Sequence, residues 1–257
     1  MTTPAACAER RRAFRALHET GCFLLPNPWD VGGAVRLARL GYQALATSSY
    51  ACGVALGRDD YQISLDEALE HMRLLAGATA LPVNADFENG FADAPERVAE
   101  NVWRAVATGI AGLSIEDQHG ESLYELELAV ERVAAAKQAL LASGEDVVLV
   151  ARTEAYLVGR CEPRLVIDRL LRYAEAGADC LYAPGVTDLA TLRDIVRAVA
   201  PRPVNVLLMT PAMRVSELEQ AGVRRVSLGG ALAAAAWRGF DAVARQFLEQ
   251  GRVPERS

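Results

Sequence analysis

Short apolar runs bounded by turn residues recur along the chain, and each is long enough for one buried β-strand. Eight such runs lie at residues 22–25, 44–47, 83–87, 112–116, 147–152, 180–183, 204–208 and 225–228. Apolar runs of four to eight residues between turn signals are typical of strands that are buried on both faces. The pattern therefore predicts a sheet of eight strands.

Amphipathic helical patterns fill most of the intervals between these runs. They cover residues 30–40, 64–75, 94–108, 126–143, 164–176, 188–200 and 214–221, and further helices are predicted at 4–19 and 231–250. Ser64 and Glu67 have the spacing of a capping box, which marks a helix start. Gly109, Gly177 and Gly222 each follow a helical pattern and precede a strand, as a helix-ending glycine does.

This regular alternation of strands and helices predicts the fold class α/β and, within it, a (β/α)8 TIM barrel. The barrel would carry an extra N-terminal helix and a C-terminal helical tail. The alternative is an open doubly wound sheet, which is disfavoured because no G-x-G-x-x-G follows the first strand. No linker or low-complexity segment interrupts the 257 residues, so residues 1–257 are expected to form a single domain.

The composition of the chain limits which partners and which cellular compartment we expect for the protein. The net charge is −6 and no long basic block occurs, so we expect no nucleic-acid partner. No run of about 18 apolar residues predicts a membrane span, and no apolar segment near the N-terminus predicts a secretory signal. The five cysteines form no C-x-x-C pair, which is typical of a reducing, cytoplasmic location.

The clearest chemical signal is the pair Asp86 and Glu88, which ends the apolar run at 83–87. Residues two apart in a strand project from the same face, so both carboxylates are expected to point to one spot. Two such charges repel each other unless a cation lies between them or they share a proton. Hard oxygen ligands of this kind suit Mg²⁺ or Mn²⁺.

Two further strands also end in charged residues. The run at 112–116 ends in Glu116 and Asp117, and the run at 147–152 ends in Arg152, with Glu154 two residues later. A single such ending is common where a strand emerges into water. Three together predict one polar site at the carboxyl ends of the strands, where TIM-barrel enzymes carry their catalytic groups.

Six segments in this order resemble the isocitrate lyase/phosphoenolpyruvate mutase superfamily. They are L-P-N-P-W-D at 25–30, A-T-S-S at 46–49, A-D-F-E-N-G at 85–90, S-I-E-D at 114–117, A-R-T-E-A at 151–155 and P-V-N-V at 203–206. The resemblance implies a β/α barrel that binds Mg²⁺ and a small oxo- or hydroxy-carboxylate. It also implies cleavage or formation of a C–C or P–C bond through an enolate-like species.

The same resemblance implies roles for individual residues. Asp86 would contact the metal directly, while Glu88 and Glu116 would hold it partly through its waters. Asp60 matches a further acid near the metal, and Asp59 beside it leaves the register open by one residue.

Substrate contacts follow from the resemblance in the same way. Arg152 would grip a substrate carboxylate, and Ser48 and Ser49 would hold the oxo-acid end. Asn205 would meet the distal part of the substrate. Trp29 is a candidate for the pocket wall, with packing in the core as the alternative.

The loop after the fourth strand departs from the family. Lyase branches carry a K-K-C-G-H-type segment there, whereas this chain has D-Q-H-G-E-S-L-Y at 117–124, without cysteine or lysine. His119 is the titratable residue of this loop, and with an ordinary pKa of ~6.5 it is a candidate acid or base. The alternative is an exposed loop histidine.

These residues favour a Mg²⁺-dependent lyase or decarboxylase that acts on a small α-oxo dicarboxylate such as oxaloacetate. The alternatives are a phosphoenolpyruvate- or phosphonopyruvate-type mutase or hydrolase, and a retro-aldol lyase of a substituted malate. A non-catalytic metabolite-binding barrel is the alternative of another class. The resemblance further implies a homo-oligomer, a dimer or a tetramer, and the apolar residues of the helix at 231–250 would permit one.

Overall fold

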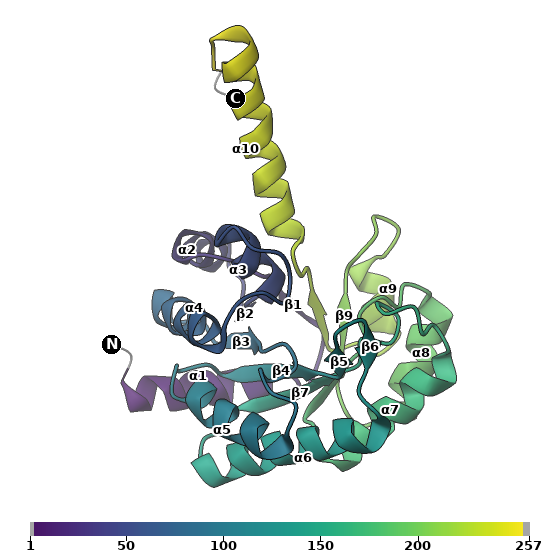
Figure 1. The fold of residues 1–257 in the computed structure, drawn as a ribbon. Coiled ribbons are helices and arrows are strands. Elements are labelled where there is room, and N and C mark those ends of the chain that lie inside the picture. Colours follow the sequence, from purple (N-terminus) through teal and green to yellow (C-terminus); the bar gives the residue numbers. More distant parts are fainter. Residues whose placement is uncertain (1–2, 254–257) are drawn as a thin grey trace.

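Eight parallel strands form the centre of the molecule, with helices around them (Figure 1). The computed structural model describes residues 3–253. The strands pair in the order β1-β10-β9-β8-β7-β4-β3-β2. They are β1 Phe23–Leu25, β2 Leu45–Ala46, β3 Val83–Asp86, β4 Gly112–Glu116, β7 Val148–Arg152, β8 Cys180–Tyr182, β9 Val204–Leu207 and β10 Arg225–Ser227.

The two ends of this sheet meet and nearly close the barrel. The backbone N–H of Ala46 donates to the carbonyl oxygen of Pro26 at 3.0 Å, which joins β2 to the end of β1. The Asn27 side chain adds a second link. Its Nδ2 donates to the Thr47 carbonyl at 2.8 Å, and its Oδ1 accepts from the N–H groups of Leu228 and Gly229. The predicted (β/α)8 barrel is confirmed.

All the helices except α3, Ser49–Ala55, follow the predicted pattern, with their ends shifted by a few residues. They are α1 Pro4–Ala16, α2 Val31–Arg39, α3 Ser49–Ala55, α4 Leu65–Ala78, α5 Pro95–Val106, α6 Leu126–Ser143, α7 Pro163–Glu175, α8 Leu189–Val199, α9 Val215–Gln220 and α10 Ala231–Gln250. The capping box of Ser64 and Glu67 is present at the start of α4, where each residue bonds to the other's backbone. None of these helices among residues 3–253 has the length and apolar character of a bilayer-crossing segment.

One helix and one hairpin of two short strands were not predicted from the sequence. The short helix α3 begins directly after β2, with Ser48 as its N-cap. The loop after β4 folds into a hairpin of β5 Gln118–His119 and β6 Ser122–Leu123. Both are too short to show a periodic pattern of apolar residues. They matter because both lie next to the acids at the strand ends.

Helix α1 packs against the barrel at the end where the strands begin. Its Phe14 is fully buried, and a Cβ placed on Gly112, the first residue of β4, would lie 2.6 Å from the Phe14 ring. Phe14 also packs edge-on against His18 and Phe23. The N-terminal helix therefore closes this end of the barrel, and ligands must enter from the other end.

Helix α10 projects away from the barrel (Figure 1). Phe240 is 64% exposed, Phe247 is 63% exposed and Leu248 is 86% exposed. Ala233 is the one residue of this helix that is fully enclosed by the rest of residues 3–253. The predicted helical tail is confirmed, and the side chains of Phe240 and Phe247 remain exposed in the single chain.

Candidate active site

A cavity opens at the carboxyl ends of the strands, where the sequence predicted a polar site. Its lining includes Asn27, Thr47, Ser48, Ser49, Asp60, Tyr61, Asn84, Asp86, Ser114, Glu116, Arg152, Tyr182, Asn205, Arg225 and Ser227. The cavity between these walls has a volume of about 160 Å³. That is enough for a small carboxylic acid.

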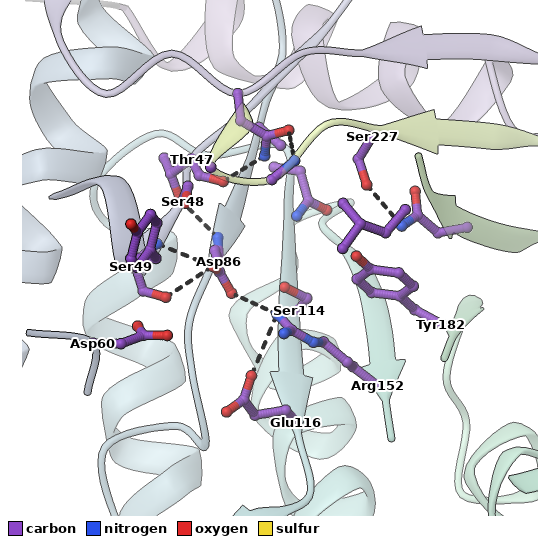
Figure 2. A pocket seen from close by; sticks show the side chains of 18 of the residues that line it. Thr47, Ser48, Ser49, Asp60, Asp86, Ser114, Glu116, Arg152, Tyr182 and Ser227 are labelled. Carbon is purple, nitrogen blue, oxygen red and sulfur yellow. Dashed lines mark hydrogen bonds and ion pairs between the residues drawn. The ribbon is translucent and has the colours of Figure 1, made fainter. Parts of the chain in front are cut away.

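Asp86 ends β3 and points into this cavity, held by the turn between β2 and α3. The backbone N–H of Ser49 donates to Asp86 Oδ2 at 3.0 Å, and the Ser49 hydroxyl donates to the same oxygen at 2.9 Å. The backbone N–H of Asp86 donates to Thr47 Oγ1 at 2.7 Å. Figure 2 shows the two Ser49 bonds converging on the carboxylate and the Thr47 bond at the backbone N–H of Asp86. The orientation of Asp86 is therefore set before any ligand binds.

Arg152 lies between two of the predicted acids. Its Nη1 is 3.3 Å from Asp86 Oδ1 and 3.3 Å from Glu116 Oε2 (Figure 2). Its Nε donates to Glu154 Oε1, and its Nη2 donates to Glu154 Oε2 at 3.0 Å. This two-point contact fixes the plane of the guanidinium. Three carboxylates therefore surround one cation.

Glu116 is the most strongly desolvated acid of the cavity wall. It is 4% exposed, and burial raises its pKa well above the usual range. The charge of Arg152 opposes this shift, while the charges of Glu154 and Asp86 add to it. The arrangement favours a proton or a cation at Glu116.

Glu88 does not share the spot that the sequence predicted. Strand β3 ends at Asp86, and Glu88 adopts a left-handed φ of 44°, so the two-residue alternation of a strand no longer applies. Its side chain lines a neighbouring cavity with Asn89 and Gln118. Burial, together with the charges of Asp86 and Asp60, raises the pKa of Glu88 to about 8. Glu88 is thus under the influence of the Asp86 charge, although its side chain lies in an adjacent cavity.

Asp60 lies at the rim of the main cavity, in the loop after α3. Partial desolvation of its carboxyl group raises its pKa, and the negative charge of Asp86 adds to the shift. Asp59 does not line the cavity, and its side chain accepts a long bond from Gln62. Of the two adjacent acids, Asp60 is therefore the one placed near Asp86.

The donor set fits a divalent cation, although the ligands are not yet gathered around one point. Glu88 Oε1 and Glu116 Oε1 are buried and have no hydrogen-bond partner. Unpaired buried carboxylate oxygens with raised pKa values are suited to a hard cation. Between residues 3 and 253, however, no three His, Cys, Asp or Glu side chains are grouped closely enough to hold a metal. Arg152 occupies the space between Asp86 and Glu116.

The two serines after β2 serve the local structure. The Ser48 hydroxyl accepts from the backbone N–H of Ala51 at 3.2 Å and caps α3. Ser49 donates both its N–H and its hydroxyl to Asp86. Both residues line the cavity, as expected, but the Ser49 donors are directed at Asp86.

Besides Glu88, two predicted site residues do not line the cavity. Trp29 lies at the turn before α2, where its carbonyl oxygen is 2.9 Å from His71 Nε2. His119 lies in the β5–β6 hairpin with a side chain that is 58% exposed, and its Nδ1 is 3.3 Å from Asp93. Its ring packs against Tyr124. The predicted catalytic histidine therefore faces a surface acid outside the cavity.

Sequence reasoning placed Glu154 among the charged strand endings without giving it a role, and it missed other residues of the site. Glu154 is fully buried against Arg152, and Tyr182 and Arg225 reach the cavity from β8 and β10. Tyr61 covers the mouth, where its hydroxyl donates to Gln118 Oε1 at 3.0 Å. The signal for Tyr182 was its position in a strand next to that of Arg152. No local pattern distinguishes an inward-facing residue from an outward-facing one in a run of three.

Comparison with known proteins places the chain in a family. The family model for phosphoenolpyruvate phosphomutase matches residues 14–248. The chain belongs to this family. It is part of the isocitrate lyase/phosphoenolpyruvate mutase superfamily, which contains lyases and mutases, so the resemblance drawn from the sequence is confirmed.

Individual members of the phosphoenolpyruvate phosphomutase family and its superfamily are similar over most of this chain. A 2-methylisocitrate lyase from Escherichia coli is 33% identical over 233 residues, which cover 82% of this chain and 75% of that lyase. An oxaloacetate decarboxylase from Pseudomonas aeruginosa is 32% identical over 237 residues, which cover 87% of this chain and 80% of that enzyme. A crystal structure from Burkholderia cenocepacia superposes with a TM-score of 0.93 at 44% identity, covering 96% and 91% of the two chains.

Proposed function

We propose that this protein is a Mg²⁺-dependent lyase that decarboxylates a small α-oxo dicarboxylate such as oxaloacetate. The observation that carries the proposal is the composition of the cavity wall. Asp86, Glu116 and Arg152 meet there, and no Cys, Lys or His from residues 3–253 lines it. A cavity of this kind supplies charge and orientation, and its lining, in the part of the chain that the structure describes, contains no cysteine, lysine or histidine that could act as a base.

Loss of CO₂ from a substrate is compatible with a cavity lining of this composition. The departing carboxylate leaves its bonding electron pair on the neighbouring carbon, and no proton is transferred while the bond breaks. The guanidinium of Arg152 would lie beside the negative charge that develops on the oxo oxygen. Two of the tyrosines that line the cavity, Tyr61 and Tyr182, would exclude bulk water from this charge.

Four acids would hold the metal. They are Asp86, Glu116, Asp60 and, from the adjacent cavity, Glu88. The chemistry that bound Mg²⁺ supplies is stabilisation of negative charge on an adjacent oxo group. The unpartnered oxygens of Glu88 and Glu116 support this assignment.

The reactions named for the two relatives, 2-methylisocitrate cleavage and oxaloacetate decarboxylation, differ in whether they need a base. Cleavage of a hydroxy-acid such as 2-methylisocitrate needs a base, because a hydroxyl proton must be removed. The hairpin of this chain carries neither cysteine nor lysine, and its His119 lies outside the cavity. The similarity to oxaloacetate decarboxylase is therefore the better guide to this chain.

Steady-state assays of the purified protein would test the proposal. Oxaloacetate with Mg²⁺ should give pyruvate well above the rate with Mg²⁺ alone, and chelation of the metal should abolish the difference. Parallel assays would use 2-methylisocitrate and phosphonopyruvate. Turnover of either of these, with oxaloacetate at the metal-only rate, would refute the decarboxylase and favour the retro-aldol lyase or the mutase.

We further propose that the protein forms a homo-oligomer through α10. The exposed apolar residues Phe240, Val243 and Phe247 recur at helical spacing and line one side of this helix. An apolar stripe of this kind is unfavourable in water, and a second copy of the chain offers a matching stripe.

A further inference from the structure

Asp117 is a charged residue at a strand end that does not line the cavity. It directly follows Glu116, the last residue of β4, and is 3% exposed. Consecutive residues of an extended segment point to opposite sides, so the Asp117 side chain turns away from the side that Glu116 occupies. The Asp117 carboxylate therefore lies behind the cavity wall, on the side of helix α7.

Three donors bind this carboxylate. Its Oδ1 accepts from the backbone N–H of Glu154 at 2.9 Å. Its Oδ2 accepts from Arg169 Nη1 at 3.1 Å and from the Tyr173 hydroxyl at 2.6 Å. Arg169 and Tyr173 are both buried and lie one turn apart on α7. Asp117 thus connects helix α7 to the backbone that follows strand β7.

Asp117 contacts this backbone on both sides of the turn after β7. Its backbone N–H donates to the carbonyl oxygen of Arg152 at 3.1 Å, while its side chain accepts from the N–H of Glu154. The Glu154 carboxylate in turn makes the two-point contact with the Arg152 guanidinium. The link from the Asp117 carboxylate to the guanidinium therefore passes through one residue.

Glu154 differs from the other two acids around Arg152. Asp86 and Glu116 are shared between this guanidinium and the proposed metal, whereas Glu154 does not line the cavity and pairs with Arg152 alone. With a metal on the shared acids, the orientation of Arg152 depends on Glu154. The orientation of Glu154 depends on Asp117, which holds its backbone N–H.

An acid at the opposite end of β7 makes the same kind of link. Asp179 Oδ2 accepts from the backbone N–H of Leu149 at 2.9 Å, and Lys137 of α6 donates to both Asp179 oxygens at 2.9 and 3.0 Å. Asp179 thus connects β7 to a helix as Asp117 does, but near the start of the strand. It does not line the cavity, and it supplies a matched control.

We propose that Asp117 is a positioning residue that fixes Glu154 and, through it, the orientation in which the Arg152 guanidinium meets the substrate. This deepens the proposed function and rests on it, because Arg152 is taken as a substrate-binding residue. Asp117 lies behind the wall, so its substitution acts on the substrate only through Arg152. Asp117 should therefore matter only where residue 152 can make the two-point contact with Glu154.

A double-mutant cycle tests this dependence. Asp117→Asn is made in the wild type and in Arg152→Lys, whose lysine cannot make the two-point contact. The kcat/KM for oxaloacetate with Mg²⁺ is measured, together with the dissociation constant of pyruvate by calorimetry in excess Mg²⁺. Asp117→Asn should weaken both by about 10-fold in the wild type, and by less than about 2-fold in Arg152→Lys.

The control and a second variant keep the cycle decisive. Asp179→Asn should leave both constants within about 2-fold of its parent in either background, even where it lowers stability. Tyr173→Phe removes the 2.6 Å bond to Asp117 and leaves the carboxylate in place. It should weaken both constants by about 3-fold in the wild type alone, and it replaces Asp117→Asn if that variant does not fold.

Three results would overturn the positioning role. Asp117→Asn would leave both constants unchanged, or it would weaken them by the same factor in both backgrounds, as a general loss of structure would. Equal losses in Asp117→Asn and Asp179→Asn would be the third. Arg152→Lys without an effect of its own would also refute the role, because nothing would then depend on the orientation of Arg152.

Failure of the positioning role and failure of the proposed function give different patterns. Pyruvate affinity that depends on Asp117 only in the presence of Arg152, without turnover of oxaloacetate, keeps the role and refutes the decarboxylase. Turnover of oxaloacetate with independent losses in the two variants refutes the role alone. A protein that neither binds pyruvate nor consumes oxaloacetate refutes both.

Discussion

Arg152 Nη1 lies 3.3 Å from Asp86 Oδ1, in the place where a metal between Asp86 and Glu116 would be expected. Either the Arg152 guanidinium or a divalent cation can neutralise the negative charge of Asp86 and Glu116. A bound metal would therefore weaken the pairing of Arg152 with Asp86 and leave Glu154 as its main partner. This relationship links metal binding to the freedom of Arg152 to meet a substrate.

Asp86→Asn should weaken metal binding. The substitution keeps the shape of the side chain and its bonds from Ser49 but removes the charge. We expect Mn²⁺ affinity to fall by about 10- to 100-fold and turnover to fall at least as much. Paramagnetic resonance of free Mn²⁺ measures the affinity. Asp59→Asn is the control, because Asp59 does not line the cavity; equal losses in the two variants would contradict the assignment.

Glu154→Gln should release Arg152 from its fixed plane. Glu154 is fully buried and is the two-point partner of this guanidinium. Loss of its charge should lower the free energy of unfolding by about 2 kcal/mol and raise KM for the substrate. Chemical denaturation and steady-state kinetics measure the two effects. Glu162→Gln, at an exposed position, should change neither, and unchanged kinetics in Glu154→Gln would argue against the orienting role.

His119→Gln should leave turnover within about three-fold of the wild type, since the ring faces Asp93 outside the cavity. Arg152→Lys, measured beside it, should lose far more because lysine cannot make the two-point contact. The kcat and KM values of both variants, measured at saturating Mg²⁺, show whether His119 takes part in catalysis. A loss of 100-fold in His119→Gln would mean that the hairpin moves and brings this residue to the substrate.

Stability should fall at low pH through His18. Burial lowers its folded-state pKa from 6.5 to about 3, so the imidazole is neutral when folded and charged when unfolded between these values. Unfolding then takes up a proton. The free energy of unfolding should fall by about 1.4 kcal/mol per pH unit as the pH drops within this window.

Denaturant titrations from pH 7 to pH 4.5 measure this slope. His18→Gln cannot titrate, so the difference between its slope and that of the wild type isolates the His18 contribution from that of the carboxylates. Parallel slopes would show that the imidazole is not desolvated by Phe14 and Phe23 as its position indicates.

Phe247→Glu on α10 should dissociate the proposed oligomer. The Phe247 side chain is 63% exposed in the single chain and lies on the apolar side of the helix. Ala242→Glu adds the same charge on the opposite side of α10 and is the matched control. Light scattering after size-exclusion chromatography gives the masses. A wild type that is monomeric at micromolar concentration would contradict the homo-oligomer.

Local sequence patterns were sufficient for the barrel and for part of its site. Apolar runs and amphipathic periods depend on neighbours in the chain, so all eight strands and the long helices were predictable. The short helix α3 and the β5–β6 hairpin were not predictable, because segments of so few residues show no periodic pattern of apolar positions. Asp86, Glu116 and Arg152 were predictable since each ends a strand, and the ends of parallel strands meet.

The sequence by itself determined the succession of strands and helices and the identity of the charged groups at the strand ends. The tertiary structure alone decided how those groups pair. Glu88 turns into an adjacent cavity, His119 lies on an outer hairpin, and Asp117 accepts from the backbone N–H of Glu154 behind the cavity wall. The physical reason is the closure of the barrel, which sets residues from distant strands at the same depth.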